Sequence, residues 1–165
     1  MSALTHTVYL SLGSNVGTMH ATLHSALTAI NADDNCSVLH TSNLYKTQPW
    51  GVTEQAHFLN AVCCITTNYT PIQLLHFINS IEHSFGRIRT ATNKWQERTL
   101  DIDILLFNNQ VLHSTPLTIP HAHLHERNFV LIPLCEIAPN VIHPILNKSI
   151  AQLQAECTDV SWVEK

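Results

Sequence analysis

Two aspartates one residue apart interrupt an otherwise apolar run in the middle of the chain. Asp101 and Asp103 lie in "ERTLDIDILLF", residues 97–107. In a strand, residues two apart project from one face, roughly 7 Å apart, so both carboxylates should face one way. The other face should carry apolar side chains into the core: Leu100, Ile102, Ile104 and Leu106. A buried carboxylate needs a partner or a metal, and Mg²⁺ takes one or two carboxylates, waters and substrate phosphates. The pair therefore predicts a site for one or two Mg²⁺ ions.

Positive charge is concentrated directly before this pair. The chain has only 8 Lys and Arg, and the stretch "GRIRTATNKWQER" holds Arg87, Arg89, Lys94 and Arg98. Cations beside a metal-binding acidic pair are expected where a polyphosphate meets its metal ion; the alternative is a solvated loop. Neither G-x-x-x-x-G-K-[ST] nor G-x-G-x-x-G is present. A bound nucleotide would therefore depend on side-chain cations and metal to hold its phosphates.

Composition narrows the class of protein. A chain of 165 residues with 45% hydrophobic and 12% charged residues predicts one globular domain, residues 1–165. A formal net charge of −4 argues against nucleic-acid binding, which needs a basic surplus. The apolar runs are too short to span a membrane, and residues 1–15 lack a basic leader. Five cysteines without a C-x-x-C pair suit reduced thiols. These features predict a cytoplasmic protein, and a monomer is expected.

Three histidines in "HAHLH" raise the question of a zinc site. His121, His123 and His125 alternate along this stretch, with no cysteine nearby in sequence. Structural zinc usually takes four tetrahedral ligands, often thiolates. Polar surface imidazoles are the favoured interpretation of this trio.

The order of predicted elements indicates the fold. Residues 6–14 alternate as a strand, and apolar residues then recur at helical spacing over residues 19–30. Residues 38–47 and 57–67 are expected to be extended. Thr70 and Pro71 predict a helix start, and its expected apolar stripe ends before Gly86: Ile72, Leu75, Ile78, Ile81 and Phe85. Adding the strand with the aspartates gives α+β, ferredoxin-like βαββαβ, an antiparallel sheet with helices on one face and a C-terminal extension. A parallel βαβα sheet fits less well, because two strands follow one another without a helix.

Several blocks, in order, resemble one enzyme family. They are "YLSLGSNVG", "LYKTQPWG", "QAHFLNAV", "IEHSFGRIR", "KWQERTLDIDILLF" and "LTIPHAHLHERNFVLIPLCEIAP". Together they resemble 6-hydroxymethyl-7,8-dihydropterin pyrophosphokinase, a folate-pathway enzyme, from about Val8 to Pro144. The resemblance implies a ferredoxin-like fold and transfer of pyrophosphate from MgATP to the pterin hydroxymethyl group, with release of AMP.

The resemblance also implies roles for particular residues. Asp101 and Asp103 match ligands of two Mg²⁺ ions. The matching ATP-binding residues are Arg87, Arg98, His121 and Arg127. The implied catalytic residues are Arg89, Arg98, Arg127, Asp101 and Asp103. The implied pterin-binding residues are Thr47, Phe58, Asn60, Trp95 and Phe129, with the two phenylalanines stacking on the ring.

One departure and two alternatives remain. The family usually has Gly or Ala two residues before the signature arginine, whereas this chain has Gln96. A non-catalytic or altered paralogue that binds pterin or nucleotide is one alternative, against which the intact Asp101 and Asp103 argue. A different metal-dependent nucleotide enzyme on a similar sheet is the other. The matching Phe58 and Asn60 argue against it.

Overall fold

The computed structural model describes residues 5–50, 54–87 and 99–165. Its elements, in chain order, are β1 (His6–Ser14), α1 (Met19–Asn31), β2 (Cys36–Thr41), β3 (Tyr45–Thr47), β4 (Phe58–Thr67), α2 (Pro71–Ser84), β5 (Asp101–Phe107), β6 (Leu112–His113), β7 (Thr118–Ile119), a short 3₁₀ helix (Leu124–Glu126), α3 (Asn128–Ile137), α4 (Ile150–Glu156) and β8 (Val163–Glu164).

The main sheet has the strand order β5-β1-β4-β3-β8, and β2 also pairs with β4. Every ladder between these strands is antiparallel. Strands β2 and β3 pair with successive halves of β4, so together they take the place of one ferredoxin-like strand. The predicted ferredoxin-like α+β fold is confirmed, including the two strands that follow one another without a helix.

Helix α2 begins and ends where local chemistry requires it. The Thr70 side chain accepts from the Gln73 backbone, and the Gln73 side chain accepts from the Thr70 backbone, which forms a capping box. Gly86 ends the helix with φ of +83°, a conformation that favours glycine. The expected stripe was partly wrong. Leu74 is buried in the core, whereas Ile72 is 36% exposed, because the stripe that includes Ile78 continues toward the N-terminus through Leu74, four residues earlier.

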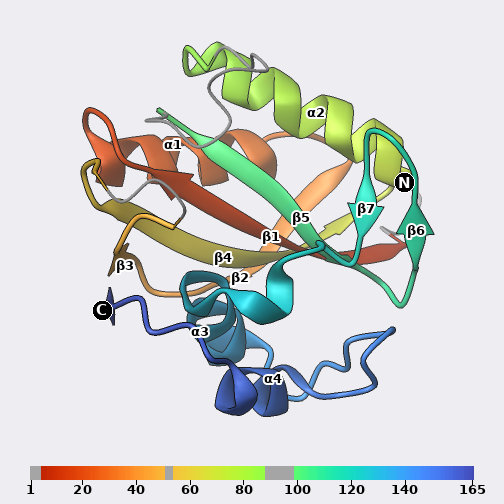
Figure 1. Ribbon diagram of the computed structural model, residues 1–165. Helices are drawn as coiled ribbons and strands as arrows, with labels where there is room; N and C mark the ends of the chain where they lie inside the picture. The colour runs from red at the N-terminus through yellow and green to blue at the C-terminus, as the bar shows by residue number, and fades with distance from the viewer. Residues whose placement is uncertain (1–4, 51–53, 88–98) are drawn as a thin grey trace.

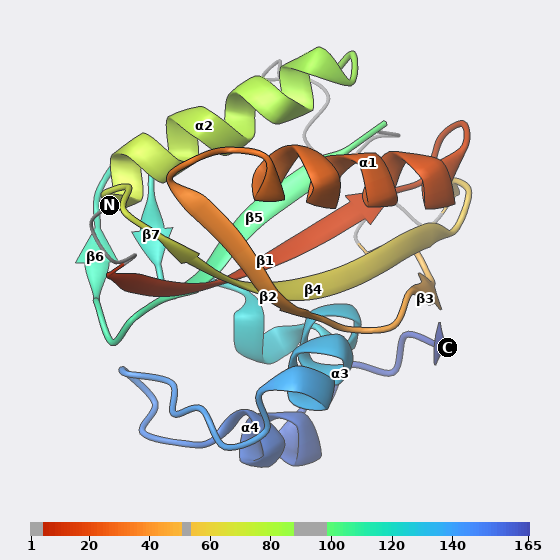
Figure 2. The same cartoon turned by 180° about the vertical axis from the view of Figure 1, so that it is seen from behind.

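Helices cover both faces of the sheet, so the expectation of one covered face was wrong. In Figures 1 and 2, α1 and α2 lie on one side of the sheet, and α3 and α4 lie on the other. Two hydrophobic clusters match these layers: α1 and α2 contribute to the first, and α3 and α4 to the second. The sequence of α3, "NFVLIPLCEI", is apolar almost all round, and such a helix must be buried on more than one side.

A register shift in β5 turns part of this strand over. Its ladder to β1 shifts between the pairs Tyr9–Leu106 and Leu10–Ile104, as a β-bulge does. Ile102 and Ile104 pack in the first cluster, as predicted, but Leu106 packs in the second. The prediction that Leu106 faces the same side of the sheet as Ile102 and Ile104 was therefore wrong, because the bulge turns Leu106 to the other side.

Two further expectations concerned the cysteines and membrane-spanning segments. Cys63 and Cys64 are buried in the core, whereas Cys135 is only partly buried, and all five cysteines are free thiols. In the described ranges, no helix combines the length and apolar character that crossing a membrane requires.

Candidate functional site

A small cavity opens on the sheet face that α3 only partly covers. Strands β1, β4 and β5 form its floor, and the segment after β3 and the start of α3 form its walls. The empty space within it is about 520 Å³, including open solvent at its mouth. We call it the aromatic cavity, because Phe58 and Phe129 both line it.

The floor of the aromatic cavity is shaped by a glycine and an amide. Gly13 of β1 is paired with Asn60 of β4, and a Cβ on Gly13 would lie 2.5 Å from Asn60 Oδ1. Asn60 Nδ2 donates to Thr47 Oγ1 at 2.6 Å, and both side chains are buried. This hydrogen bond fixes the orientation of the amide at the cavity edge.

A second, wider cavity adjoins the first. It is lined by α2, β5 and the segment from Pro116 to His123, and its volume is about 1,120 Å³ including open solvent. We call it the polar cavity, since Arg87 and His121 line it. Asp101, Asp103 and Arg127 line both cavities. The two predicted metal ligands therefore lie at the junction.

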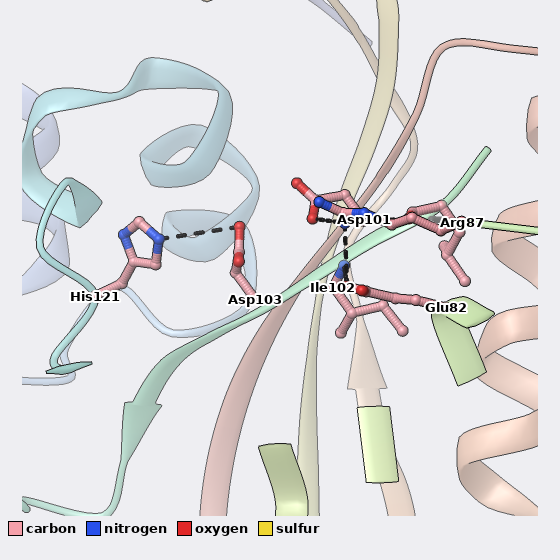
Figure 3. A network of polar contacts seen from close by, with 7 residues as sticks. Glu82, Arg87, Asp101, Ile102, Asp103 and His121 are labelled. Carbon is pink, nitrogen blue, oxygen red and sulfur yellow. Dashed lines mark hydrogen bonds and ion pairs between the residues drawn. The ribbon is translucent and has the colours of Figure 1, made fainter. Parts of the chain in front are cut away.

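Asp101 is linked to the buried end of α2 through Arg87 (Figure 3). The Arg87 guanidinium donates to Asp101 Oδ1 and, at 3.2 Å, to Glu82 Oε1. Glu82 is only 1% exposed and also accepts from the Ile102 backbone N–H at 2.8 Å. The paired carboxylates favour the charged form of Arg87 and raise its pKa against the opposing effect of burial.

His121 approaches the second aspartate, Asp103, from the end of the group opposite Arg87 (Figure 3). Its Nε2 lies 3.9 Å from Asp103 Oδ2, too far for a hydrogen bond. Its Nδ1 accepts from the His123 backbone N–H at 3.1 Å, so the neutral ring carries its proton on Nε2. Burial, then the positive Arg127 nearby, lowers the pKa of His121 to about 4. At neutral pH this side chain is therefore an uncharged donor aimed toward the junction.

Arg127 is buried at the junction under a tryptophan. Its guanidinium carbon lies 4.2 Å from the centroid of the Trp50 ring and 5.6 Å from that of Phe129. Both distances are within the range of cation–π attraction. Arg127 is 6% exposed, so the aromatic rings hold its charge in place at the cavity wall.

The structure brings most predicted site residues to these two cavities. Arg87, Asp101, Asp103, His121 and Arg127 meet at or beside the junction. The predicted pterin-binding residues Thr47, Phe58, Asn60 and Phe129 line the aromatic cavity. Arg89, Trp95 and Arg98, together with Lys94 and Gln96, lie outside the described residues.

The histidine trio does not act as one group. His123 pairs with Glu126 at 2.8 Å, while His121 faces Asp103. Among residues 5–50, 54–87 and 99–165, no three His, Cys, Asp or Glu side chains are grouped so that they could hold a metal ion. A metal at the junction would have two carboxylate ligands from the described chain and would need further oxygens from a ligand or water.

Sequence reasoning missed four residues that shape the site. Gly13, Gln48 and Trp50 line the aromatic cavity, and Glu82 anchors Arg87. All four stand in blocks used for the family resemblance, which was the available signal. Glu82 gave a second one, as a charged residue between Ile81 and Phe85 in a helix.

Comparison with known proteins defines the class. The chain matches the family model of 7,8-dihydro-6-hydroxymethylpterin-pyrophosphokinase (HPPK) over residues 9–139. It belongs to the HPPK family.

Individual relatives agree with this assignment. The chain is 44% identical over 138 residues to 2-amino-4-hydroxy-6-hydroxymethyldihydropteridine pyrophosphokinase of Haemophilus influenzae, covering 84% of this chain and 85% of the relative. It is 38% identical to the protein of the same name from Aquifex aeolicus, covering 92% of each. Folic acid synthesis protein fol1 of Schizosaccharomyces pombe is 40% identical over 87% of this chain, which spans 19% of that longer protein.

Solved structures share the fold. Plasmodium falciparum HPPK-DHPS (wild type with STZ-DHP) superposes with a TM-score of 0.74 and 16% identity, covering 92% of this chain. This chain spans only 43% of that chain, and at this identity the likeness concerns the fold alone.

Proposed function

We propose that the chain transfers pyrophosphate from ATP to the hydroxymethyl group of 6-hydroxymethyl-7,8-dihydropterin and releases AMP. Its HPPK relatives are named as pyrophosphokinases of 2-amino-4-hydroxy-6-hydroxymethyldihydropteridine, which supports the proposal. One observation carries the assignment of the site: Asp101, Asp103 and Arg127 line both cavities. Two substrates in adjoining cavities would place their reacting groups at these side chains.

The aromatic cavity is the proposed pterin site. Phe58 and Phe129 supply ring faces, and offset stacking contributes about 0.5–1.5 kcal/mol per pair beyond area burial. The amide of Asn60, oriented by Thr47, forms hydrogen bonds with the polar edge of the ring. An analogue without that edge would leave buried polar groups unpaired, and sites of this kind reject such analogues strongly.

The polar cavity is the proposed nucleotide site. Arg87 and Arg127 supply positive charge, and neutral His121 donates from Nε2 to a phosphate oxygen. Arg98 and the catalytic Arg89 extend this set by resemblance. Trp95 extends the pterin-binding set in the same way. Without a glycine loop, side chains such as these carry phosphate recognition.

Asp101 and Asp103 are the proposed magnesium ligands. Their carboxylates face the junction, with side chains 18% and 35% exposed, and two carboxylates completed by phosphate and water oxygens form a donor set that Mg²⁺ prefers. Two ions are proposed. Bound there, Mg²⁺ would neutralise phosphate charge and acidify the attacking hydroxyl. Arg87 would then share its charge between Asp101 and the phosphates.

The reaction is an in-line displacement. The pterin hydroxyl oxygen forms a bond to the β-phosphorus while the bond from that phosphorus to the α,β-bridging oxygen breaks, and AMP leaves with that oxygen. The hydroxyl proton passes to solvent, since none of the described side chains at the junction is assigned as a general base. The chain contributes positioning and charge stabilisation, which account for most catalysis of this type.

Three further properties are proposed with the function. Residues 1–165 act as one pyrophosphokinase domain, the protein works as a monomer in the cytoplasm, and its partners are small molecules. Gel filtration with light scattering checks the oligomeric state: a mass near 18.5 kDa is expected, and twice that mass would contradict it.

The test of function is the identity of the nucleotide product. The protein is incubated with MgATP and 6-hydroxymethyl-7,8-dihydropterin, and nucleotides are separated by chromatography. AMP formed in equal amount to pterin pyrophosphate is expected. ADP as product would refute pyrophosphate transfer, and pterin binding without turnover would support the non-catalytic paralogue.

A further inference from the structure

The C-terminal segment contacts two separate walls of the aromatic cavity. We call residues 159–164 the strap. The strap lies beyond residue 139, where the match to the HPPK model ends, so the family comparison assigns it no role. In Figure 1 the chain runs from α4 past the start of α3 to the edge of β3.

The strap is first anchored at the start of α3. Asp159 Oδ2 accepts from the Asn128 backbone N–H at 2.9 Å, and the Asp159 carbonyl accepts from Asn128 Nδ2 at 2.5 Å. The N-cap residue of α3 is Arg127, whose side chain offers only donors and cannot cap a helix. Asp159 therefore supplies, from 31 positions away, the acceptor that this helix start lacks.

The carboxylate of Asp159 is itself held in place. Its second oxygen, Oδ1, accepts from the Ser161 backbone N–H at 2.9 Å. Both oxygens are thus engaged, one by α3 and one by the strap. The neighbours of Asn128 in sequence are Arg127 and Phe129, which line the aromatic cavity.

The second anchor lies on the opposite wall. Strand β8 pairs with β3, with Val163 opposite Thr47. Just before β8, the Gln48 backbone N–H donates to the Trp162 carbonyl at 3.1 Å. The Trp162 backbone N–H donates to Gln48 Oε1 at 3.2 Å. Thr47 and Gln48 line the aromatic cavity.

We infer that the strap sets the distance between the two walls of the pterin site, with Asp159 as a positioning residue for Arg127 and Phe129. The inference rests on the proposed function. A rigidly held site loses less entropy when it binds, so fixing its walls raises affinity without a new ligand contact. The strap itself touches no reacting atom.

The test compares ligand affinities of four variants by isothermal titration calorimetry. The variants are Asp159→Ala, Asp159→Asn, a chain ending at residue 158, and the control Val160→Ala. Val160 belongs to the strap but is 97% exposed. The ligands are 6-hydroxymethyl-7,8-dihydropterin and the magnesium complex of α,β-methylene-ATP, whose bridging carbon blocks transfer.

The expected pattern is selective. Asp159→Ala should weaken pterin binding about tenfold, the equivalent of one lost helix cap. Nucleotide affinity should fall less than pterin affinity, since Arg127 lines both cavities but Arg87 and His121 lie outside the contacts of the strap. Asp159→Asn, which keeps an oxygen acceptor, should recover part of the loss. The shortened chain should bind pterin at least as weakly as Asp159→Ala, and Val160→Ala should match the wild type.

Two results would overturn the inference. One is unchanged pterin affinity in both Asp159→Ala and the shortened chain. The other is an equal loss of both ligands, which would indicate general loosening. Thermal melts identify a variant that fails to fold, and Asp159→Asn then decides the question. A wild-type protein that binds no pterin would instead refute the proposed function.

Discussion

The chemistry of the site is concentrated in two carboxylates that lie between an aromatic and a polar cavity. Asp101 and Asp103 stand two residues apart on β5; Asp101 is paired with Arg87, just after α2, and Asp103 lies 3.9 Å from His121, just after β7. Because Asp101 and Asp103 each line the aromatic and the polar cavity, a carboxylate elsewhere on β5 could not take over their position. This makes the aspartates the most informative positions to change.

Asp103→Asn should abolish turnover and spare pterin binding. The amide keeps the shape but loses the charge that a divalent cation requires, and loss of one such group lowers kcat by at least about a hundredfold. AMP formation gives kcat, and calorimetry gives the pterin Kd. Asp34→Asn, at an exposed position between α1 and β2, is the matched control. Near-normal kcat in the Asp103 variant would rule out the magnesium assignment.

Gly13→Ala should weaken pterin binding through the floor of the cavity. The added Cβ would lie 2.5 Å from Asn60 Oδ1, so the amide must move and strain its bond to Thr47. Overpacking of this kind costs about 1–3 kcal/mol, or roughly 5- to 150-fold in Kd. Titration with the pterin measures it, with a melting curve as control. Wild-type affinity would show that Asn60 does not read the ring.

Residue chemistry was predictable where a side chain carries its own signal. Paired aspartates, clustered cations and Phe58 beside Asn60 could be identified from spacing and resemblance. Gly13 could not be assigned a role, because its importance depends on the strand register that places it opposite Asn60. Trp50 and Glu82 act through other side chains, Arg127 and Arg87, and such contacts are not written in local sequence.

At the scale of elements, the loop between α3 and α4 depends on a neutral histidine. His143 is 4% exposed, and its Nδ1 accepts from the backbone N–H groups of Ile145 and Leu146, both at 3.2 Å. Burial, then the nearby His125, lowers the pKa of His143. Protonation would remove the acceptor that organises this loop.

Acid should therefore destabilise the protein through His143. Because its pKa is lower in the folded than in the unfolded state, its stabilisation is complete above about pH 6.5 and is lost as pH falls through the folded-state pKa. The loss is at most about 1.4 kcal/mol per pH unit. Urea unfolding between pH 7 and 5 measures the slope.

A matched pair of variants isolates this contribution. His143→Asn can still accept through its amide oxygen but cannot titrate, so its stability should vary less with pH than that of the wild type. His113→Asn, at an exposed position, should keep the wild-type slope. Equal slopes in wild type and His143→Asn would contradict the account.

Element types and order were predictable from β1 to β5, whereas the face of the sheet that each helix covers was not. Period-2 and helical spacing, with Thr70 and Gly86 as boundaries, identified the ferredoxin-like order. The position of α3 and α4 on the opposite face was missed, because an all-round apolar helix does not say which surface buries it. The bulge that turns Leu106 depends on the pairing of β5 with β1, which one strand's sequence cannot reveal.

At the scale of the whole molecule, the two faces of the sheet differ in how completely helices cover them. One face is closed by α1 and α2 over the larger core, while α3 and α4 cover only part of the other (Figure 2). The uncovered part holds the aromatic cavity, and the polar cavity adjoins it and extends along β5 to α2. At the rim of this opening, the strap joins the start of α3 to the edge of β3. A segment beyond the family match therefore contributes to the shape of the site.

The central claim is that magnesium joins the nucleotide phosphates to Asp101 and Asp103 at the junction of the cavities. The most direct measurement is a crystal structure of the protein with Mg²⁺, α,β-methylene-ATP and 6-hydroxymethyl-7,8-dihydropterin. Mg²⁺ is expected at about 2.1 Å from oxygens of both carboxylates and of the phosphates. An ordered nucleotide and pterin with Asp101 still paired to Arg87 and no ion on either aspartate would contradict it.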